Sequence, residues 1–276
     1  MSSDLYALLE PAKRIAVEAG ERIMRIYSRG FDVQEKDDRS PLTEADLAAH
    51  QHIVAELRAL TPEIPILSEE SAHQVPAATR LSWQTFWLVD PLDGTKEFIK
   101  RNGEFTVNIA LVQGQRPVLG VVHVPAKGVT YWGVQGHGAY RQDASGEVHG
   151  IHVQPVADGP IRVVGSRSHA GPHLEAYVHA LGPHELVSQG SSLKLCLVAD
   201  GSADVYPRFG PTSEWDTAAA QAVVTSAGGR VVDLQQQPLL CNRGESILNP
   251  FFIVYGDASV DWLAAIPQAL KNSETA

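Results

Sequence analysis

The sequence predicts two halves of different construction, an α+β half followed by an α/β half. In the first half, two amphipathic helical stretches precede several short apolar runs separated by Gly and Pro, which is typical of an antiparallel sheet. From Ile161 onward, strand-like runs alternate with helical ones, which is typical of α/β structure. Because residues 142–159 are mostly polar, we place the boundary there and expect halves of residues 1–155 and 156–276.

Composition and charge exclude several classes of function. The chain has 276 residues, of which 44% are apolar, and this is ample for a large core. Its 22 basic and 32 acidic side chains give a formal net charge of −10, so no general attraction for nucleic acid polymers is expected. Cys196 and Cys241 lack metal-ligand spacing and are expected to be buried thiols in a reducing compartment.

The beginning of the chain predicts an amphipathic helix. Apolar residues recur at helical spacing from Leu5 to Ile26, and charged residues lie between them. This pattern differs from the uninterrupted apolar core of a secretory signal. Since no stretch has the length needed to span a bilayer, we expect a cytoplasmic protein without an integral membrane segment.

Further helices and strands are predicted from apolar periodicity and from capping and proline residues. Thr43 opens a second helix, where Thr43 and Asp46 have the spacing of a capping box. Pro91 is expected to end the strand at 86–89, because proline has no N–H for the ladder. The other expected strands lie at 64–67, 105–111, 118–124, within 128–140, and at 161–164, 185–187 and 203–206. Helices are expected at 173–181, 192–200 and 215–227.

Four groups of acidic residues lie where a predicted element begins or ends. They are Asp46, the pair Glu69 and Glu70, the pair Asp90 and Asp93, and Asp216. A fold presents side chains to a cleft at such boundaries. These carboxylates are therefore the candidate functional residues.

The segment Asp90-Pro91-Leu92-Asp93-Gly94-Thr95 carries the clearest chemistry. Its two carboxylates, three residues apart across a stiff turn, can converge on a hard cation such as Mg²⁺, which takes oxygen ligands. Leu92 can add its carbonyl oxygen. The amides of Gly94 and Thr95 form an anion seat if a helical turn begins there. Metal ligands beside a phosphate seat are the parts needed for metal-assisted hydrolysis of a phosphate ester.

Each signal taken alone has a simpler explanation. Asp-x-x-Asp-Gly is usually a turn, and Ser68-Glu69-Glu70 is more often a solvated helix start. Thr43-x-x-Asp46 and Ser213-x-x-Asp216 are most often helix caps. The histidines show no spacing that demands a metal. Only the combination of these motifs, in this order, indicates a metal site.

Three segments together resemble the inositol monophosphatase superfamily of lithium-sensitive phosphatases: Leu67-Ser68-Glu69-Glu70-Ser71, the run from Trp87 to Thr95, and Trp215-Asp216-Thr217-Ala218-Ala219. The resemblance spans nearly the whole chain. Within that superfamily, residues 94–110 are similar to bacterial 3′(2′),5′-bisphosphate nucleotidases, as are residues 166–169, 190–194 and 206–210. The resemblance implies a layered αβαβα sandwich with the active cleft between the halves, and inhibition by lithium.

The resemblance also implies roles for the acidic residues. It makes four carboxylates and one carbonyl ligands of Mg²⁺, namely those of Glu69, Asp90, Asp93, Asp216 and Leu92. Glu70 is the weaker member of its pair. Asp46 and Thr95 would form the catalytic pair that orients the attacking water, with Asp46 as a pure helix cap as the alternative. No covalent enzyme intermediate is required.

The substrate contacts implied by the resemblance come from both halves. In the second half they are His169, Ser191, Lys194 and Arg208; in the first they are Gly94, Thr95 and Glu69, and Asp216 completes the set. Lys194 and Arg208 suit a second phosphate. An ordinary exposed helix lysine is the alternative for Lys194. Lys96, Lys100 and Arg101 are equally compatible with a substrate contact and with a solvated surface.

The predicted function is therefore magnesium-dependent hydrolysis of the 3′-phosphate of a small bisphosphate nucleotide, adenosine 3′,5′-bisphosphate, to AMP and phosphate. One alternative is an inositol or other sugar phosphatase that uses the same metals. A second is a non-catalytic protein that senses a nucleotide or metal. The sequence leaves open a homodimer and a loose attachment to the cytoplasmic face of the inner membrane.

Overall fold

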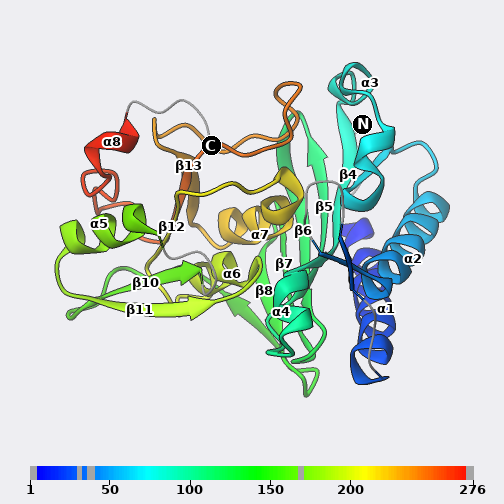
Figure 1. Cartoon of the computed structure of the whole chain (residues 1–276), viewed down its shortest axis with the longest axis horizontal. Coiled ribbons are helices and arrows are strands. Elements are labelled where there is room, and N and C mark those ends of the chain that lie inside the picture. The colour runs from blue at the N-terminus through cyan, green and yellow to red at the C-terminus, as the bar shows by residue number, and fades with distance from the viewer. Residues whose placement is uncertain (1–4, 30–32, 36–40, 167–170, 272–276) are drawn as a thin grey trace.

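The computed structural model describes residues 5–29, 33–35, 41–166 and 171–271, and it arranges them in five layers. Helices α1 (Leu9–Arg29) and α2 (Glu44–Leu60) cover the outer face of a seven-stranded sheet. Helices α6 (Leu193–Ala199) and α7 (Glu214–Ser226) separate it from a five-stranded sheet, and α5 (Pro172–Leu181) and α8 (Gln268–Lys271) lie beyond that sheet (Figure 1). The expected αβαβα sandwich is confirmed.

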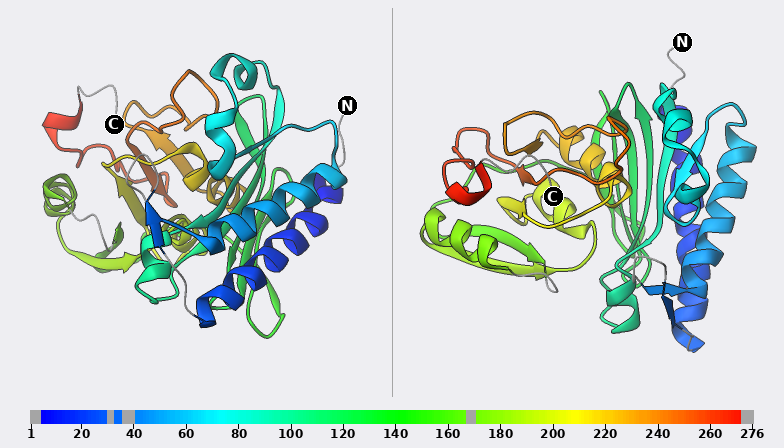
Figure 2. Two further views of the ribbon diagram at one scale, coloured as in Figure 1. Left: turned by 45° about the vertical axis from the view of Figure 1, so that its right-hand side comes forward. Right: turned by 45° about the horizontal axis from the view of Figure 1, so that its top comes forward.

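The two predicted N-terminal helices are confirmed. A 3₁₀ turn, η1 (Leu5–Leu8), precedes α1, whose buried residues follow helical spacing from Leu9 to Ile26. Thr43 caps α2 in a complete capping box with Asp46. The short strands β1 (Val33–Glu35) and β2 (Pro41–Thr43) pair antiparallel before α2. The packing of α1 against α2 and the sheet is visible in both views of Figure 2.

The seven-stranded sheet has its strands in sequence order: β3 (Ile66–Ser68), β4 (Thr85–Asp93), β5 (Thr106–Gln113), β6 (Arg116–Val124), β7 (Val129–Val134), β8 (Gly138–Gln142) and β9 (Val148–Ile151). Only β3 and β4 pair in parallel. Helices cover both faces, so the residues of β5 from Thr106 to Val112 are all buried. The predicted antiparallel sheet is confirmed.

The predicted end of a strand at Pro91 is wrong. Strand β4 runs through Pro91 to Asp93, and its register with β5 shifts between Asp90 and Asp93. A bulge leaves a residue unpaired, so a proline without an N–H is tolerated there. A bulge also changes the direction of side chains, and this one lies between Asp90 and Asp93.

The five-stranded sheet confirms the predicted alternation of strands and helices. Its order is β11 (His184–Gln189), β10 (Ile161–Ser166), β12 (Val205–Arg208), β14 (Phe252–Tyr255) and β13 (Arg230–Asp233). Strand β10 is parallel to both of its neighbours, whereas β14 is antiparallel to both of its own. The two sheets are joined by residues 152–160.

Helix α7 belongs to the second half in sequence but packs flat on the sheet of the first. A Cβ atom at Gly120 would lie 2.1 Å from the carbonyl oxygen of Ala219, and one at Gly133 would lie 2.6 Å from that of Ala222. The small residues of α7 and these two glycines therefore allow backbone to approach backbone. The contact buries Ala218, Ala219 and Val223 in the core between the sheets.

The remaining helices are short. They are η2 (Glu69–Gln74) after β3, α3 (Ala77–Leu81) before β4, and α4 (Thr95–Ile99) after β4. Among the described residues, no helix combines the length and the apolar character needed to cross a membrane.

Candidate active site

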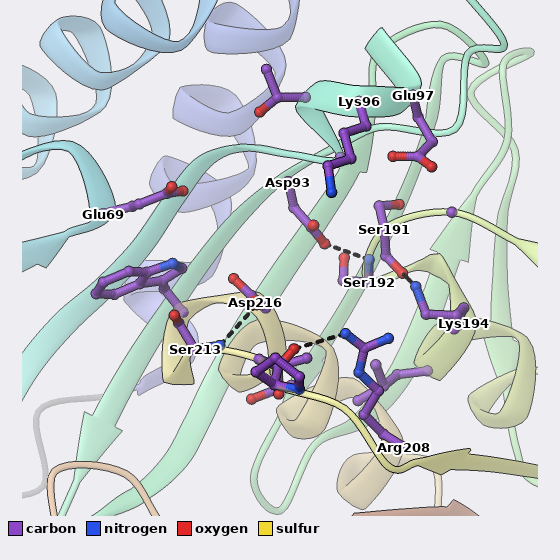
Figure 3. A pocket seen from close by; sticks show the side chains of 18 of the residues that line it. Glu69, Asp93, Lys96, Glu97, Ser191, Ser192, Lys194, Arg208, Ser213 and Asp216 are labelled. Carbon is purple, nitrogen blue, oxygen red and sulfur yellow. Dashed lines mark hydrogen bonds between the residues drawn. The ribbon is translucent and has the colours of Figure 1, made fainter. Parts of the chain in front are cut away.

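A cavity of about 430 Å³ lies between the two halves. Eight of the sequence-predicted site residues line it together: Glu69, Asp93, Gly94, Thr95, Ser191, Lys194, Arg208 and Asp216. Figure 3 shows Asp93 and Asp216 pointing toward one another, with Glu69 on one side and Lys194 and Arg208 on the other. Residues as far apart in the sequence as Glu69 and Asp216, 147 positions, thus meet in one place.

Asp90 and Asp93 are positioned by the bulged end of β4. Asp90 is 1% exposed and, like Leu92, does not line the cavity; one of its carboxylate oxygens accepts a hydrogen bond from the Leu92 N–H at 3.0 Å. Asp93 accepts from the Ser192 N–H at 2.5 Å. The second bond crosses from one half to the other, so it fixes Asp93 against the start of α6.

Glu69 and Asp216 are positioned by the first turns of helices. Glu69 begins η2 directly after β3, and it lines the cavity while Glu70 does not. Asp216 is the third residue of α7, and its Oδ2 accepts from the Ser213 N–H at 2.9 Å in a capping box. The helix-cap interpretation of Ser213-x-x-Asp216 is therefore correct for one oxygen, and the same side chain also faces the cavity.

The carboxylates raise one another's pKa. Burial raises the pKa of Asp90 well above its usual range, and the charges of Glu69, Asp93 and Asp216 raise it further. Burial raises the pKa of Asp93 to about 6, against the lowering effect of Lys194 and the Ser192 N–H. Burial, Asp93 and Glu69 raise the pKa of Asp216 well above normal. Holding these groups ionised together requires positive charge.

The donor set fits a hard divalent cation. Four carboxylates and the Leu92 carbonyl supply only oxygen atoms, which Mg²⁺, Mn²⁺ and Ca²⁺ prefer over softer metals. A bound cation would also offset the mutual repulsion that raises the three pKa values. The residues present therefore match the cation that the motifs predict.

Asp46 contacts Thr95 from the start of α2. Its Oδ2 accepts from the Thr43 N–H at 2.8 Å and from the Thr43 hydroxyl at 2.6 Å, which completes the cap. Its Oδ1 accepts from the Thr95 hydroxyl at 3.2 Å. Asp46 is 1% exposed and does not line the cavity, but it contacts Thr95, which does. The cap and the contact with Thr95 coexist because each uses a different oxygen.

The expected helical turn after Asp93 is present. Gly94 has φ +92°, a left-handed conformation that residues with a side chain rarely adopt, and α4 begins at Thr95. A Cβ atom at Gly94 would also lie 3.1 Å from the Glu104 carbonyl oxygen. The sequence thus places glycine where the backbone turns beside the cavity.

Positive charge enters the cavity mainly from the second half. Lys194 is 8% exposed, and its Nζ donates to the Ser191 carbonyl at 2.5 Å. Arg208 donates to the carbonyls of Gly210 and Pro211. Lys96 lines the cavity from the first half. Lys194 is therefore not the exposed helix lysine of the alternative interpretation.

Other sequence-predicted cations and histidines lie elsewhere. Lys100 and Arg101 do not line the cavity, and Arg101 donates to the Tyr27 carbonyl at 2.7 Å. His169 lies outside the described residues. An exposed group of Asp143, Glu147 and His149 on the β8–β9 hairpin could also gather around a cation, but it is not part of the cavity.

Sequence reasoning missed Ser192, Thr106 and Asn108 as parts of the site. The Ser192 hydroxyl contacts Thr106 at 2.9 Å and donates to Asn108 at 2.8 Å. All three lie in the segments 94–110 and 190–194, so the resemblance carried a signal for them. Their pairing joins residues more than 80 positions apart, which no local pattern reveals.

Comparison with known proteins places the chain among phosphatases. The model of the Inositol monophosphatase family matches residues 4–265. The 3′(2′),5′-bisphosphate nucleotidase CysQ of Escherichia coli K12 is 50% identical over 251 residues, covering 90% of this chain and 99% of that protein. A crystal structure of CysQ from Bacteroides thetaiotaomicron has a TM-score of 0.79 and 45% identity, covering 90% of this chain and 96% of that one. An inositol monophosphatase from Zymomonas mobilis has a TM-score of 0.74 and 27% identity, covering 93% and 96%.

Proposed function

This chain belongs to the inositol monophosphatase family, and from that premise we propose that it hydrolyses the 3′-phosphate of adenosine 3′,5′-bisphosphate to AMP and phosphate. It is a phosphatase, as its close relatives are. The substrate follows from their name, 3′(2′),5′-bisphosphate nucleotidase, at 50% identity over nearly their whole length. The inositol phosphatase alternative has weaker support, since the compared enzyme of that name is 27% identical.

One observation carries the proposal: an acidic cluster and a pair of cations face each other across a single cavity. The acidic cluster suits divalent cations beside a phosphate ester. Lys194 and Arg208, across the cavity, suit a second phosphate group. A substrate with one phosphate would leave these two cations without a partner in the ligand. A bisphosphate provides one phosphate group for the acidic cluster and its cations and a second for Lys194 and Arg208.

The metal is proposed to be Mg²⁺, held by five oxygen-bearing residues: Glu69, Asp90, Leu92, Asp93 and Asp216. Divalent cations bound there would lower the pKa of a coordinated water molecule and neutralise charge on phosphate oxygens. The protein contributes a fixed frame for them. Backbone N–H groups of Leu92, Ser192 and Ser213 each hold one oxygen of an aspartate. These bonds keep the carboxylates oriented before the substrate arrives.

Asp46 and Thr95 are proposed to orient the attacking water. The Thr95 hydroxyl has one proton, and the carboxylate of Asp46 is a stronger acceptor for it than the Leu92 carbonyl at 3.3 Å. Donation to Asp46 leaves lone pairs of the Thr95 oxygen free to accept a hydrogen bond from the attacking water, which orients it. The Gly94 and Thr95 amides are proposed to hold phosphoryl oxygens as charge develops. The frame requires no covalent enzyme intermediate.

The protein is further proposed to act in a reducing compartment, the cytoplasm. Cys196 and Cys241 are both buried free thiols, and burial raises the pKa of each well above its usual range. Such thiols are inert and suit a reducing environment. Intact activity in reducing buffer, unaffected by thiol-blocking reagents on the native protein, is the expected outcome.

A substrate panel tests the function. Purified protein should release phosphate from adenosine 3′,5′-bisphosphate in Mg²⁺ much faster than from inositol 1-phosphate. Chelation should abolish release, and millimolar lithium should inhibit it, as the family resemblance implies. Preference for inositol 1-phosphate would refute the substrate. Tight nucleotide binding without turnover would instead favour a sensing protein.

A further inference from the structure

The turn between β11 and α6 supplies much of the wall that faces the acidic cluster. Its residues Gly190, Ser191 and Ser192 all line the cavity, and so does Lys194, two residues later in the first turn of α6. Ser191 has φ +50°, a left-handed conformation that is uncommon for a residue with a side chain. Such a conformation persists only where the surroundings impose it. The contacts that impose it therefore decide where Ser191 and Lys194 stand.

The first anchor of this turn is Glu104. The Gly190 N–H donates to its Oε2 at 2.8 Å. Glu104 is 9% exposed and does not line the cavity. A hydrogen bond between an N–H and a buried carboxylate is among the stronger kinds, since the acceptor is ionised. Glu104 thus holds the turn from behind.

The second anchor is a pair of side chains on β5. The Ser192 hydroxyl donates to Asn108 Oδ1 at 2.8 Å. Because its only proton is used there, the Thr106 hydroxyl at 2.9 Å must donate to the Ser192 oxygen. Thr106 and Asn108 are 0% and 1% exposed, and neither lines the cavity. The three residues form a buried, directional link between the two halves.

We infer that Glu104, Thr106 and Asn108 are positioning residues that hold the 190–194 turn, and thereby set the preference for a nucleotide bisphosphate over a simple phosphate monoester. They touch no substrate themselves. The inference rests on the proposed function, because the turn carries two of the groups assigned there to the nucleotide, Ser191 and Lys194. A simple monoester reaches the acidic cluster but neither Ser191 nor Lys194, so it depends on the turn only through the Ser192 N–H that holds Asp93.

The test compares two substrates, adenosine 3′,5′-bisphosphate and 4-nitrophenyl phosphate, at saturating Mg²⁺. Glu104→Ala removes the acceptor for the Gly190 N–H, and we expect KM for the bisphosphate to rise about tenfold with kcat changed little. For 4-nitrophenyl phosphate, kcat/KM should change by less than about twofold. Affinity for AMP, measured by calorimetry, should fall by a factor similar to the rise in KM.

Conservative and control variants separate positioning from general damage. Glu104→Gln keeps an acceptor oxygen and should restore most of the bisphosphate affinity. Thr106→Val removes only the hydroxyl link and should raise the same KM by about threefold. The control is Thr130→Val, since Thr130 is also a buried threonine of this sheet, 3% exposed, with its hydroxyl 2.9 Å from His123 Nδ1. Thr130→Val should leave KM and kcat unchanged for both substrates.

Two results would overturn the inference. One is an unchanged bisphosphate KM in both Glu104→Ala and Thr106→Val; if Glu104→Ala does not fold, an unchanged KM in Thr106→Val overturns the inference by itself. The other is an equal loss for both substrates, which would mean that these residues support the acidic cluster instead. Failure of the proposed function is recognised separately, since the wild-type protein itself would then show no preference for the bisphosphate.

Discussion

The two walls of the cavity are built in different ways. The acidic wall consists of Glu69, Asp90, Asp93 and Asp216. Its aspartates lie at the bulged end of β4, in the sheet of the first half, and on α7, which packs flat on that sheet. The opposite wall consists of a turn and a strand end of the second half, held by a few hydrogen bonds such as Gly190 to Glu104. Backbone packing thus supports most of the proposed metal site, which receives one hydrogen bond from the opposite wall, Ser192 N–H to Asp93. Hydrogen bonds to side chains hold the wall to which the choice of substrate is assigned.

The largest effect should follow from damage to the acidic wall. Asp93→Asn removes one negative charge from the acidic cluster that is proposed to bind Mg²⁺. The value of kcat/KM should therefore fall by about 10³-fold or more for every phosphate ester. Phosphate release from the bisphosphate and from 4-nitrophenyl phosphate measures it.

The matched control for Asp93→Asn is Asp143→Asn, in the exposed hairpin group with Glu147 and His149. That variant should keep both its activity and its dependence on Mg²⁺. Undiminished turnover in Asp93→Asn would contradict the metal assignment and remove the contrast between the walls.

Damage to the packing under the acidic wall should come next. Gly120→Ala would place a methyl group 2.1 Å from the Ala219 carbonyl, so α7 must shift and the free energy of unfolding should fall by about 3 kcal/mol. Denaturant titration measures the loss. Residual activity should fall for both substrates alike, because Asp216 moves with α7.

Gly150→Ala is the control for Gly120→Ala. Gly150 is also a strand glycine of the same sheet, but the nearest atom to its Cβ position is 3.9 Å away, on Tyr140. Its free energy of unfolding should change little. Equal stability losses in the two variants would show that close contact with α7 is not what the sheet requires.

His123, on β6 and packed against Gly20 of α1, should lower the stability of the first half in acid. Burial lowers the pKa of His123 to about 4, because its ring packs inside the fold, whereas an unfolded chain has a value near 6.5. The unfolded state therefore binds more protons as pH falls from 6.5 toward 4, and stability is lost in that window. From pH 7 to pH 5 the loss from this group is about 2 kcal/mol.

His123→Gln should remove that pH dependence even if it lowers stability at pH 7. The measurement is denaturant unfolding at pH 7 and pH 5 for both proteins. His149→Gln, on the exposed β9, is the control and should leave the pH dependence of the wild type unchanged. A wild-type slope retained in His123→Gln would place the acid-sensitive group elsewhere.

The smallest effect should follow from changes to the substrate-selecting wall. Lys194→Ala removes one cation from the proposed second-phosphate site, so KM for the bisphosphate should rise about tenfold while 4-nitrophenyl phosphate is hydrolysed normally. Steady-state kinetics with both substrates measures the split. An equal effect on both would mean that the two walls do not divide their tasks.

Much of the acidic wall was predictable because most of its residues lie at the ends of regular elements. Glu69 and Asp216 stand at helix starts, and Asp93 stands at the end of a strand. Element ends are visible in a single sequence from capping patterns and apolar periodicity. The strand through Pro91 was not predictable, since the bulge that tolerates proline depends on the register with β5.

The links between the walls were not predictable from pattern. Glu104 bonds to a residue 86 positions later, and Thr106 bonds to Ser192 across the same separation. Such contacts depend on how the two halves dock, and neither half encodes that alone. Strands β13 and β14 were also missed, because β14 is short and follows a long irregular segment.

The flat seat of α7 on the first sheet has a consequence for synthesis of the chain. The inner face of that sheet is complete in sequence at Ile151, but the helix that covers it begins only at Glu214. At about 5–20 residues per second, the ribosome needs several seconds to deliver the missing cover. During that interval the nascent protein presents an uncovered apolar surface, so its N-terminal portion cannot mature before the C-terminal portion has emerged.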